Sequence, residues 1–363
     1  MRRVLHILAV LVALALSVSC ERRPLMELSN THYVRVYVDE DIKNVTTGFY
    51  NDAHNRPDYK SPDVLRVSLS DPETGTVKAE RFLRDKGEDE KGTYYEGYVI
   101  AEPGEYRLFA YNFDTESVVI SDASNHSQAK AYTNEIASHL MTRIPSRASK
   151  SDQQSAETKA PESIVYDPDH LFLANCGDLL VPYVEDVDTL KTRDGEHFSA
   201  KTVVTSYYLQ VKVKGMQYVS SSVALLTGMS GSVWLSDGSM DKEHEVTVYF
   251  EMAAGGENSA SGISSKASSD EVLIYTTFNT FGKLPDAANN LEITFDFLTV
   301  YGKPYSATFD ITDEFYTPEA IEHHWLLLDQ TIEIPEPPEG GDSGGGFTPS
   351  VDDWSDVETD IVM

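Results

Sequence analysis

The sequence predicts a mostly β protein built from two sandwich domains. The chain of 363 residues contains 20 Tyr and 14 Phe among many Val and Thr, and these residue types favour strands. Many short segments place an apolar residue at every second position, the period of a half-buried strand. Long amphipathic helical segments are few. The chain length that remains after residues 1–19 is typical of two domains of ordinary size.

Residues 1–19 are predicted to be a signal peptide. Arg2 and Arg3 precede an apolar run over residues 7–16, and this order is typical of export signals. The run is shorter than the roughly 20 residues that a membrane-spanning helix needs. It ends in Ser-Val-Ser-Cys, which resembles the bacterial lipobox, although Leu16 is displaced by one position. Cys20 is therefore the predicted lipid attachment site, with plain secretion as the alternative.

The second cysteine, Cys176, then has no partner in the chain. We interpret it as a small buried hydrophobic side chain, because no neighbouring motif would activate its thiol. The formal net charge of −30 repels nucleic acid, which excludes it as a partner. The same charge repels anionic lipid, so a covalent acyl anchor such as palmitate is the favoured route to a membrane.

After a tether over residues 20–31, the first domain is predicted over residues 32–144. Two alternating strands are clear, with one face formed by Val34, Val36 and Val38 and by Leu65, Val67 and Leu69. A Pro103–Gly104 turn separates two further alternating segments and indicates a hairpin or tight antiparallel connection. Residues 133–141 are predicted to form a short helix.

Residues 145–163 are rich in Ser, Gln and Lys and are predicted to be an exposed linker or loop. The second domain is predicted over residues 164–335, with a polar, flexible loop at residues 253–270. Its longest strand is expected over residues 201–215. The residues predicted to share core faces are Val203, Thr205, Tyr207, Leu209, Val211 and Val213, then Val246, Val248 and Phe250, then Leu291, Ile293, Phe295 and Phe297.

Residues 336–363 form a Gly/Pro-rich hinge and an acidic tail. Within the tail, Val357, Thr359, Ile361 and Met363 alternate with acidic residues, which would suit an edge strand on a tether. A disordered acidic terminus is the alternative, because chain ends are ordered only when they are tied down.

No catalytic, cofactor-binding or metal-binding motif was found, and the chain is predicted not to be an enzyme. The pair His323 and His324 lacks further ligands at metal-site spacing and is interpreted as packed or surface histidines. Residues 167–170, Asp-Pro-Asp-His, indicate a turn or cap rather than an acid–base pair. Asp39, Glu40 and Asp41 are interpreted as a solvated acidic loop. Aromatic residues in the strands are expected to be mostly core.

Many short stretches together resemble a Bacteroidetes lipoprotein family related to the fimbrillins. They include CERRPL, HYVRVYVDE, EGYVIAEPGEYRLFAYNFDTE, DPDHLFLAN, SYYLQVKVKG, LLTGMSGSV, TFNTFGKLP and GGGFTPSVDDW. The resemblance implies two tandem transthyretin-like antiparallel β-sandwich domains and a lipid-anchored protein of the outer membrane or cell surface. It also implies assembly by strand exchange, in which a terminal strand of one subunit completes the sheet of another. The segment Val357–Met363 is the candidate strand.

Three functions follow as hypotheses. The first is a fimbrial anchor, accessory or adhesin-like structural protein, with fimbrial subunits or another envelope protein as partners. The second is a carbohydrate-binding surface lipoprotein, which requires exposed, coplanar aromatic rings on one sheet face. The third is a hydrolase, which requires two carboxylates that converge in a pocket. Outward-facing and periplasmic orientations both remain open.

Overall fold

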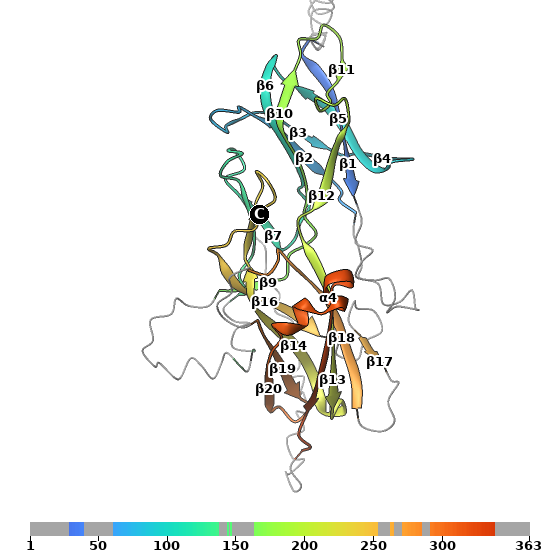
Figure 1. The fold of residues 1–363 in the computed structure, drawn as a ribbon, viewed down its shortest axis with the longest axis vertical. Helices are drawn as coiled ribbons and strands as arrows, with labels where there is room; N and C mark the ends of the chain where they lie inside the picture. The colour runs from blue at the N-terminus through green and yellow to red at the C-terminus, as the bar shows by residue number, and fades with distance from the viewer. Residues whose placement is uncertain are drawn as a thin grey trace, which may run out of the picture.

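The computed structural model describes residues 29–39, 61–137, 144, 146, 163–252, 262–264, 271–284 and 291–337. The first half of this part is dominated by strands β1 Thr31–Asp39, β2 Leu65–Ser70, β3 Val77–Leu83, β4 Asp85–Asp89, β5 Gly92–Ile100, β6 Gly104–Asn112, β10 Phe172–Val181, β11 Asp188–Thr189 and β12 Phe198–Thr202. They form one nine-stranded sheet in the order β3-β2-β6-β10-β12-β1-β5-β4, with β11 beside β1. This sheet lies at the upper end of the molecule in Figure 1.

Strands from both halves of this sheet pack into a single core, so the sheet folds over on itself. The predicted alternation is confirmed here, because Val34 and Val36 of β1 and Val67 of β2 are completely buried in the same cluster. The two ends of the sheet also meet, since a Cβ atom built at Gly97 of β5 would lie 2.9 Å from Leu83 of β3. A curled sheet with one interior face is a β-sandwich in its packing.

In this half the hairpin interpretation of one connection was wrong, and the predicted helix is contradicted over its described residues. Strands β5 and β6 do not pair with each other, because β5 pairs with β1 and β4 whereas β6 pairs with β2 and β10. The turn at Pro103 is therefore a corner between layers, and it lets Val99 and Leu108 reach one core.

The helix predicted over residues 133–141 is absent from its described part, residues 133–137. Strand β8 Lys130–Thr133 pairs with β7 Val118–Ser121, and Glu135 forms a bridge with Val165. These pairings hold the chain extended, so tertiary contacts override the helix propensity. Residues 138–141 lie outside the described residues.

The second half contains two sheets that face each other. Their strands are β9 Ile164–Tyr166, β13 Thr205–Lys214, β14 Val219–Ser230, β16 Glu245–Met252, β17 Gly262–Ser264, β18 Glu271–Thr280, β19 Glu292–Thr299, β20 Pro304–Asp310 and β21 Trp325–Glu333. One sheet has the order β17-β18-β13-β21 and the other β20-β19-β14-β16-β9. Short helical segments are η3 Met216–Tyr218, η4 Asp313–Tyr316 and α4 Pro318–His323.

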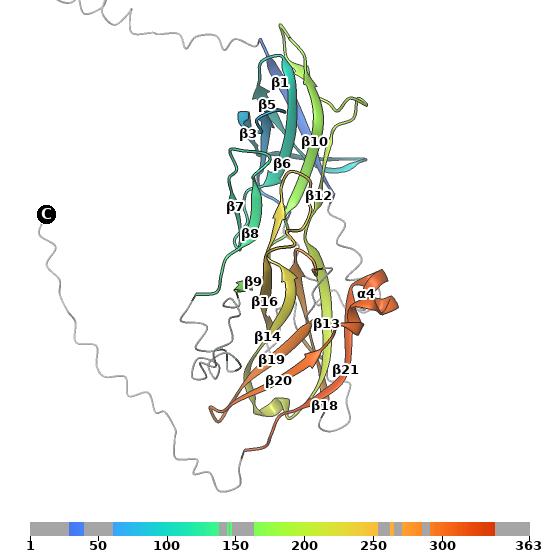
Figure 2. The ribbon, with the colours of Figure 1, turned by 60° about the vertical axis from the view of Figure 1, so that its left-hand side comes forward.

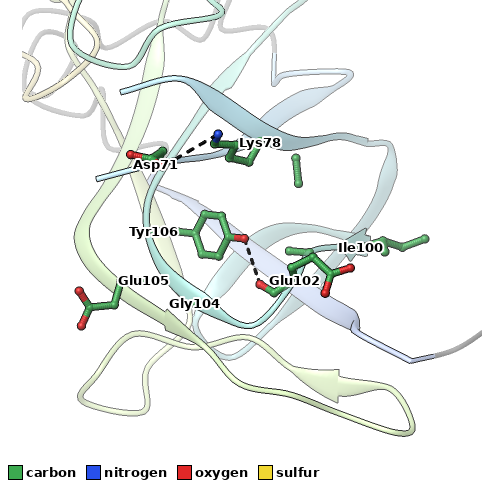
Figure 3. Close-up of a pocket in the computed structure, with 9 residues that line it drawn as sticks. Asp71, Lys78, Ile100, Glu102, Gly104, Glu105 and Tyr106 are labelled. Atoms are coloured by element: carbon green, nitrogen blue, oxygen red, sulfur yellow. Dashed lines mark hydrogen bonds and ion pairs between the residues drawn. The ribbon is translucent and has the colours of Figure 1, made fainter. Parts of the chain in front are cut away.

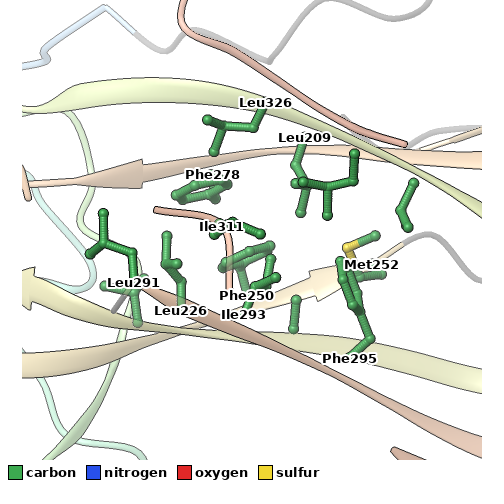
Figure 4. Packing of buried hydrophobic residues seen from close by; sticks show 14 of the residues in the cluster. Leu209, Leu226, Phe250, Met252, Phe278, Leu291, Ile293, Phe295, Ile311 and Leu326 are labelled. Atoms are coloured by element: carbon green, nitrogen blue, oxygen red, sulfur yellow. The ribbon is translucent and has the colours of Figure 1, made fainter. Parts of the chain in front are cut away.

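The core of the second half lies between these two sheets, as Figure 4 shows. Ile293 and Phe295 of β19 face Leu209 of β13 and Phe278 of β18, and all four are at most 1% exposed. The faces predicted for residues 246–250 and 291–297 are therefore confirmed. The burial of many branched and aromatic side chains in one layer supplies the main stabilising free energy of this half.

The strand predicted over residues 201–215 is in fact two strands in different sheets. Strand β12 ends at Thr202 and belongs to the first sheet, whereas β13 begins at Thr205 in the second half. The Thr202 hydroxyl accepts a hydrogen bond from the Val204 N–H at 3.1 Å and stabilises the break. Val203 consequently packs in a different cluster from Leu209.

Part of the loop predicted over residues 253–270 is also a strand, β17, which pairs with β18. Backbone hydrogen bonds to a sheet edge need no apolar side chain, and for this reason the polar composition did not reveal it. The sheets are mixed rather than purely antiparallel. The parallel pairs are β1–β11, β1–β12, β13–β21 and β9–β16.

A fourth sheet, of three strands, connects the two halves. Its order is β15-β8-β7, with β15 spanning Ser232–Trp234, and it pairs strands about 100 positions apart in sequence. Val233 of β15 packs in one cluster with Phe109 of β6 and Leu173 of β10. Strands from before and after residues 145–163 share the first sheet. The domain boundaries expected from the sequence remain a prediction.

Candidate interaction surfaces

The outer face of strands β1 and β5 carries a group of tyrosines around one arginine, which we call the tyrosine face. Because valines of β1 point into the core, the residues between them point outward. The antiparallel register of β5 then sets its own outward residues beside them. The directly opposed pairs are Tyr33 with Tyr98, Arg35 with Glu96, and Tyr37 with Tyr94.

Arg35 organises this face. Its Nη2 lies 2.8 Å from Glu96 Oε2 and its Nη1 lies 3.3 Å from Asp89 Oδ2, while the guanidinium stacks 3.7 Å from the centroid of the Tyr94 ring. A hydrogen bond with Tyr37 and contacts with its other partners raise the pKa of Arg35 above its usual range, so it is charged throughout. Charge-assisted and stacked contacts of this kind fix ring positions.

The tyrosine hydroxyls bond within the same face. The Tyr37 hydroxyl donates to Asp89 Oδ2 at 2.8 Å, and the Tyr33 hydroxyl donates to Glu96. Burial, followed by the hydrogen bond to Glu96, raises the pKa of Tyr33. Tyr98 is 54% exposed. The result is a rigid aromatic surface whose polar atoms are largely satisfied, and such surfaces lose little conformational entropy on binding.

The rings of this face are not coplanar. Tyr33 and Tyr98 meet at an interplanar angle of 61°, and Tyr37 and Tyr94 meet at 63°. A platform for stacking sugar rings requires aromatic faces presented side by side in one plane. Neither of these opposed pairs therefore forms the coplanar platform that the carbohydrate hypothesis requires.

Replacing Arg35 by methionine is expected to lower the free energy of unfolding by about 1–2 kcal/mol, because Glu96 and Asp89 lose their shared cation. Urea denaturation followed by circular dichroism measures the change. The matched control is Lys91→Met, since Lys91 and its partner Glu196 are more than 60% exposed. We expect a change within about 0.5 kcal/mol for the control. Equal effects for both variants would contradict the central position of Arg35.

A cavity of about 380 Å³ lies between β3 and the corner that joins β5 to β6 (Figure 3). Ile100 and Tyr106 supply its apolar wall, and the Tyr106 hydroxyl donates to the Glu102 carbonyl oxygen at 3.0 Å. Figure 3 shows the Glu102 and Glu105 carboxylates directed to different sides. The third carboxylate of the lining, Asp71, pairs with Lys78 at 4.0 Å, so Figure 3 shows no two carboxylates turned toward each other as the hydrolase hypothesis requires.

The two site predictions that matter most fall outside the described residues. Cys20 and the segment with Val357, Thr359, Ile361 and Met363 are not described, so both stay predictions. Cys176 is a free, buried thiol, as predicted, and burial raises its pKa. Among the helices that the structure describes, none has the length and apolar character that a bilayer crossing needs.

The structure describes both histidines of the predicted pair but only the first residue of the predicted acidic loop. The His323 ring stacks on Trp325 with centroids 4.3 Å apart, and the His324 N–H donates to Ala320 O at 3.1 Å where α4 ends. Across the described ranges, no three His, Cys, Asp or Glu side chains gather where they could bind a metal ion. Glu40 lies outside these ranges, so the solvated acidic loop stays a prediction.

The segment Asp-Pro-Asp-His connects β9 to β10 with no turn and no helix end at these residues, so its interpretation as a local turn or cap was wrong. The Asp169 carboxylate accepts hydrogen bonds from the backbone N–H groups of Glu116 and Ser117. The Asn279 side chain of β18 donates to Pro168 O at 3.0 Å. These contacts tie the connection to both halves of the molecule.

Asp167 in this connection should make stability depend on pH. Burial, with a smaller contribution from the Asp169 and Glu251 carboxylates, raises the pKa of Asp167 to about 6. The folded state therefore binds more protons than the unfolded chain between about pH 4 and pH 6, and the free energy of unfolding falls as pH rises through this range. A pKa rise of this size corresponds to about 3 kcal/mol.

Asp167→Asn is accordingly expected to be about 1–2 kcal/mol more stable than wild type at pH 7.5 and equal to it at pH 4, since the amide stays neutral but gives up one acceptor. Urea unfolding at both pH values measures this difference. Asp178→Asn is the control, because the Asp178 side chain is 64% exposed. A loss of stability in Asp167→Asn at pH 7.5 would show that the ionised carboxylate is needed.

The tyrosine face was missed at the level of sequence, where aromatic residues in strands were assigned to the core by default. That default is correct for Phe278 and Tyr208, which are at most 3% exposed. The missed signal was the alternation of Tyr33, Arg35 and Tyr37 with the valines of the same strand. Large aromatic residues at polar-face positions are unusual enough to be read as a surface feature.

The folded-over sheet and the packed pair of sheets define a β-sandwich protein. Its candidate contact surfaces are the rigid tyrosine face and the edges of its sheets. Residues 19–251 match the family model described as "Domain of unknown function (DUF5119)", and the chain belongs to this family. The chain is 23% identical over 310 residues to a protein of Bacteroides ovatus named "Putative fimbrium anchoring subunit Fim4B", covering 81% of this chain and 82% of that protein.

Two solved structures from Bacteroides match the chain over most of its length, and the first of them is similar in fold. A "putative adhesin" from Bacteroides ovatus ATCC 8483 has a TM-score of 0.53 at 19% identity, covering 88% of this chain and 98% of the other. A "putative adhesin" from Bacteroides thetaiotaomicron VPI-5482 has a TM-score of 0.45 at 12% identity, covering 82% and 89% of the two chains.

Proposed function

We propose that this chain is a lipid-anchored structural protein of the cell envelope, of the fimbrial-anchor or adhesin type. The observation that carries the proposal is the match to a relative named as a fimbrium anchoring subunit over about four fifths of both chains. A match of this extent supports a shared arrangement of domains rather than one shared motif. The proposal assigns the chain no catalytic step.

The proposed anchor is an acyl group on Cys20 that holds the protein at the outer membrane or cell surface. Each buried methylene contributes about 0.8 kcal/mol, so two or more acyl chains give stable attachment. Cys20→Ser is expected to move the protein from the membrane fraction to the soluble fraction in a flotation assay. Cys176→Ala is the matched control, because Cys176 is buried in the core. Membrane flotation of Cys20→Ser at the wild-type level would contradict the anchor.

The proposed partners are fimbrial subunits or another envelope protein. Two features support contact with such a partner. The alternating segment Val357–Met363 could add to a sheet edge through main-chain hydrogen bonds, and the tyrosine face offers a rigid aromatic surface.

Chemical crosslinking of intact cells followed by purification tests the partnership. We expect a fimbrial subunit or envelope protein to copurify with the wild-type chain. Removal of residues 351–363 should abolish the crosslink if the tail is the donated strand, and Tyr98→Ser should weaken it if the tyrosine face makes the contact. A wild-type chain recovered only as a monomer without crosslinks would contradict the proposal.

A further inference from the structure

The chain enters the first sheet at one end of the molecule, next to two loops. The Asn30 N–H donates to Val184 O at 2.9 Å, and the Ala101 N–H donates to Asn30 O at 3.1 Å. The Asn30 side-chain amide also donates to Glu102 at 3.2 Å. We call residues 100–105 and 180–187, which surround this point, the N-terminal tip. Figure 2 shows β1 beginning at the end of the long axis opposite to β18 and β21.

The N-terminal tip exposes large apolar side chains. Eleven such residues are strongly exposed in the described part of the chain, and four of them lie in these two short segments. They are Ile100, Leu180, Tyr183 and Val187, with exposed fractions of 55%, 59%, 63% and 40%. Single exposed apolar residues are common on protein surfaces, but a local concentration marks a contact surface.

The sequence sets how far this tip can be from the proposed acyl group. Nine residues separate Cys20 from Asn30, and a fully extended chain covers at most about 3.6 Å per residue, so the separation cannot exceed about 35 Å. A tethered surface meets the bilayer at a high effective concentration, so a contact too weak to form in solution becomes populated.

The charges of the tip select the kind of lipid surface. Glu102 and Glu105 lie beside Ile100, and Glu185 and Asp186 follow Tyr183. Anionic headgroups would be repelled by these carboxylates, whereas a zwitterionic surface would not. Tyrosine and aliphatic side chains are suited to the headgroup layer, where an apolar body and a polar hydroxyl are both accommodated.

We propose that the N-terminal tip rests on the zwitterionic lipid surface to which Cys20 is anchored, with Ile100, Leu180 and Tyr183 entering the headgroup layer. The long axis of the molecule then points away from the membrane, and the half that contains β13 to β21 lies farther from the lipid than the tip. This inference rests on the lipid anchor under the proposed function, and it adds a second contact and an orientation.

Site-specific quenching tests the contact. The acylated protein carrying Cys176→Ala and Tyr183→Cys is labelled with a fluorophore and bound to phosphatidylcholine vesicles that contain headgroup nitroxide lipid. The control carries Ile321→Cys, because Ile321 is 66% exposed on α4 in the other half. We expect quenching at position 183 to exceed that at position 321 at least threefold. Replacing about a third of the lipid by phosphatidylglycerol should reduce the difference.

The outcomes separate the two proposals. Absence of flotation would overturn the lipid anchor and the tip contact together. Flotation with equal quenching at both positions would overturn only the tip contact. Strong quenching at position 183 that persists unchanged in vesicles rich in phosphatidylglycerol would overturn the preference for zwitterionic lipid. Protection of position 183 in native envelopes but not in pure lipid vesicles would assign the tip to a protein partner instead.

Discussion

Replacing Phe250 by alanine is expected to lower the free energy of unfolding by about 3–5 kcal/mol. The Phe250 ring of β16 stacks on the Phe278 ring of β18, with centroids 4.3 Å apart and planes 7° apart. Because β16 and β18 belong to opposing sheets, this pair joins the two layers of the core shown in Figure 4. Both residues are at most 3% exposed, so the surroundings can collapse into the cavity only partly.

Urea denaturation measures the effect of Phe250→Ala, and Tyr183→Ala is the matched control. Tyr183 carries a ring of similar size but is 63% exposed, so its removal should change stability by less than about 0.5 kcal/mol. If the two variants lose similar stability, the opposing sheets of the second half do not share a single core.

Asp241→Ala is expected to cost about 2–4 kcal/mol, because it removes the anion from a largely buried pair that links the two halves. Lys130 Nζ of β8 lies 2.7 Å from Asp241 Oδ2, and the Asp241 side chain is only 11% exposed. The Ser232 hydroxyl of β15 donates to the same carboxylate at 3.2 Å. Although burial alone would raise it, the hydrogen bond from Lys130 holds the pKa of Asp241 below its usual value.

The double variant Lys130→Met, Asp241→Ala provides the internal test of this pair. The double variant should be more stable than Asp241→Ala alone. In Asp241→Ala the Lys130 ammonium stays over the Trp234 ring without its anion, and Lys130→Met removes that ammonium. Asp178→Ala is the control at an exposed ion pair and should be nearly neutral. A stability of Asp241→Ala within about 0.5 kcal/mol of wild type would show that the three-stranded sheet does not depend on this pair.

The sequence was sufficient to predict which side chains face a core. Alternation located Val34 and Val67 in the first half and Ile293 in the second, because the side chains of a strand alternate between its two faces whatever its partners are. It could not predict the partners. Whether the strand before Pro103 pairs with the strand after it depends on contacts with β1 and β10, which are distant in sequence.

The break between β12 and β13 shows the same limit. Val203 and Thr205 continue an unbroken alternation, and no Gly or Pro marks the change of sheet. The chain changes sheets there because β12 pairs with β1 and β10, whereas β13 pairs with β18 and β21. Periodicity carries no information about which sheet a strand joins.

The candidate surface was predictable only in part. The alternation of Tyr33, Arg35 and Tyr37 is visible in one strand, but the opposing Tyr94 and Tyr98 join it only through the register of β1 with β5. The cation that holds the face together therefore acts between segments about 60 residues apart. A surface that several strands form through such long-range pairing becomes apparent only from the fold.

The central claim is that a cysteine-linked lipid tethers this β-sandwich protein to the envelope. Intact-mass measurement of the protein purified from native membranes tests it most directly. We expect a chain that begins at Cys20, with a mass increased by a diacylglyceryl group and a further acyl chain. A mature chain with an unmodified thiol at Cys20, or one that begins after Cys20, would contradict the account.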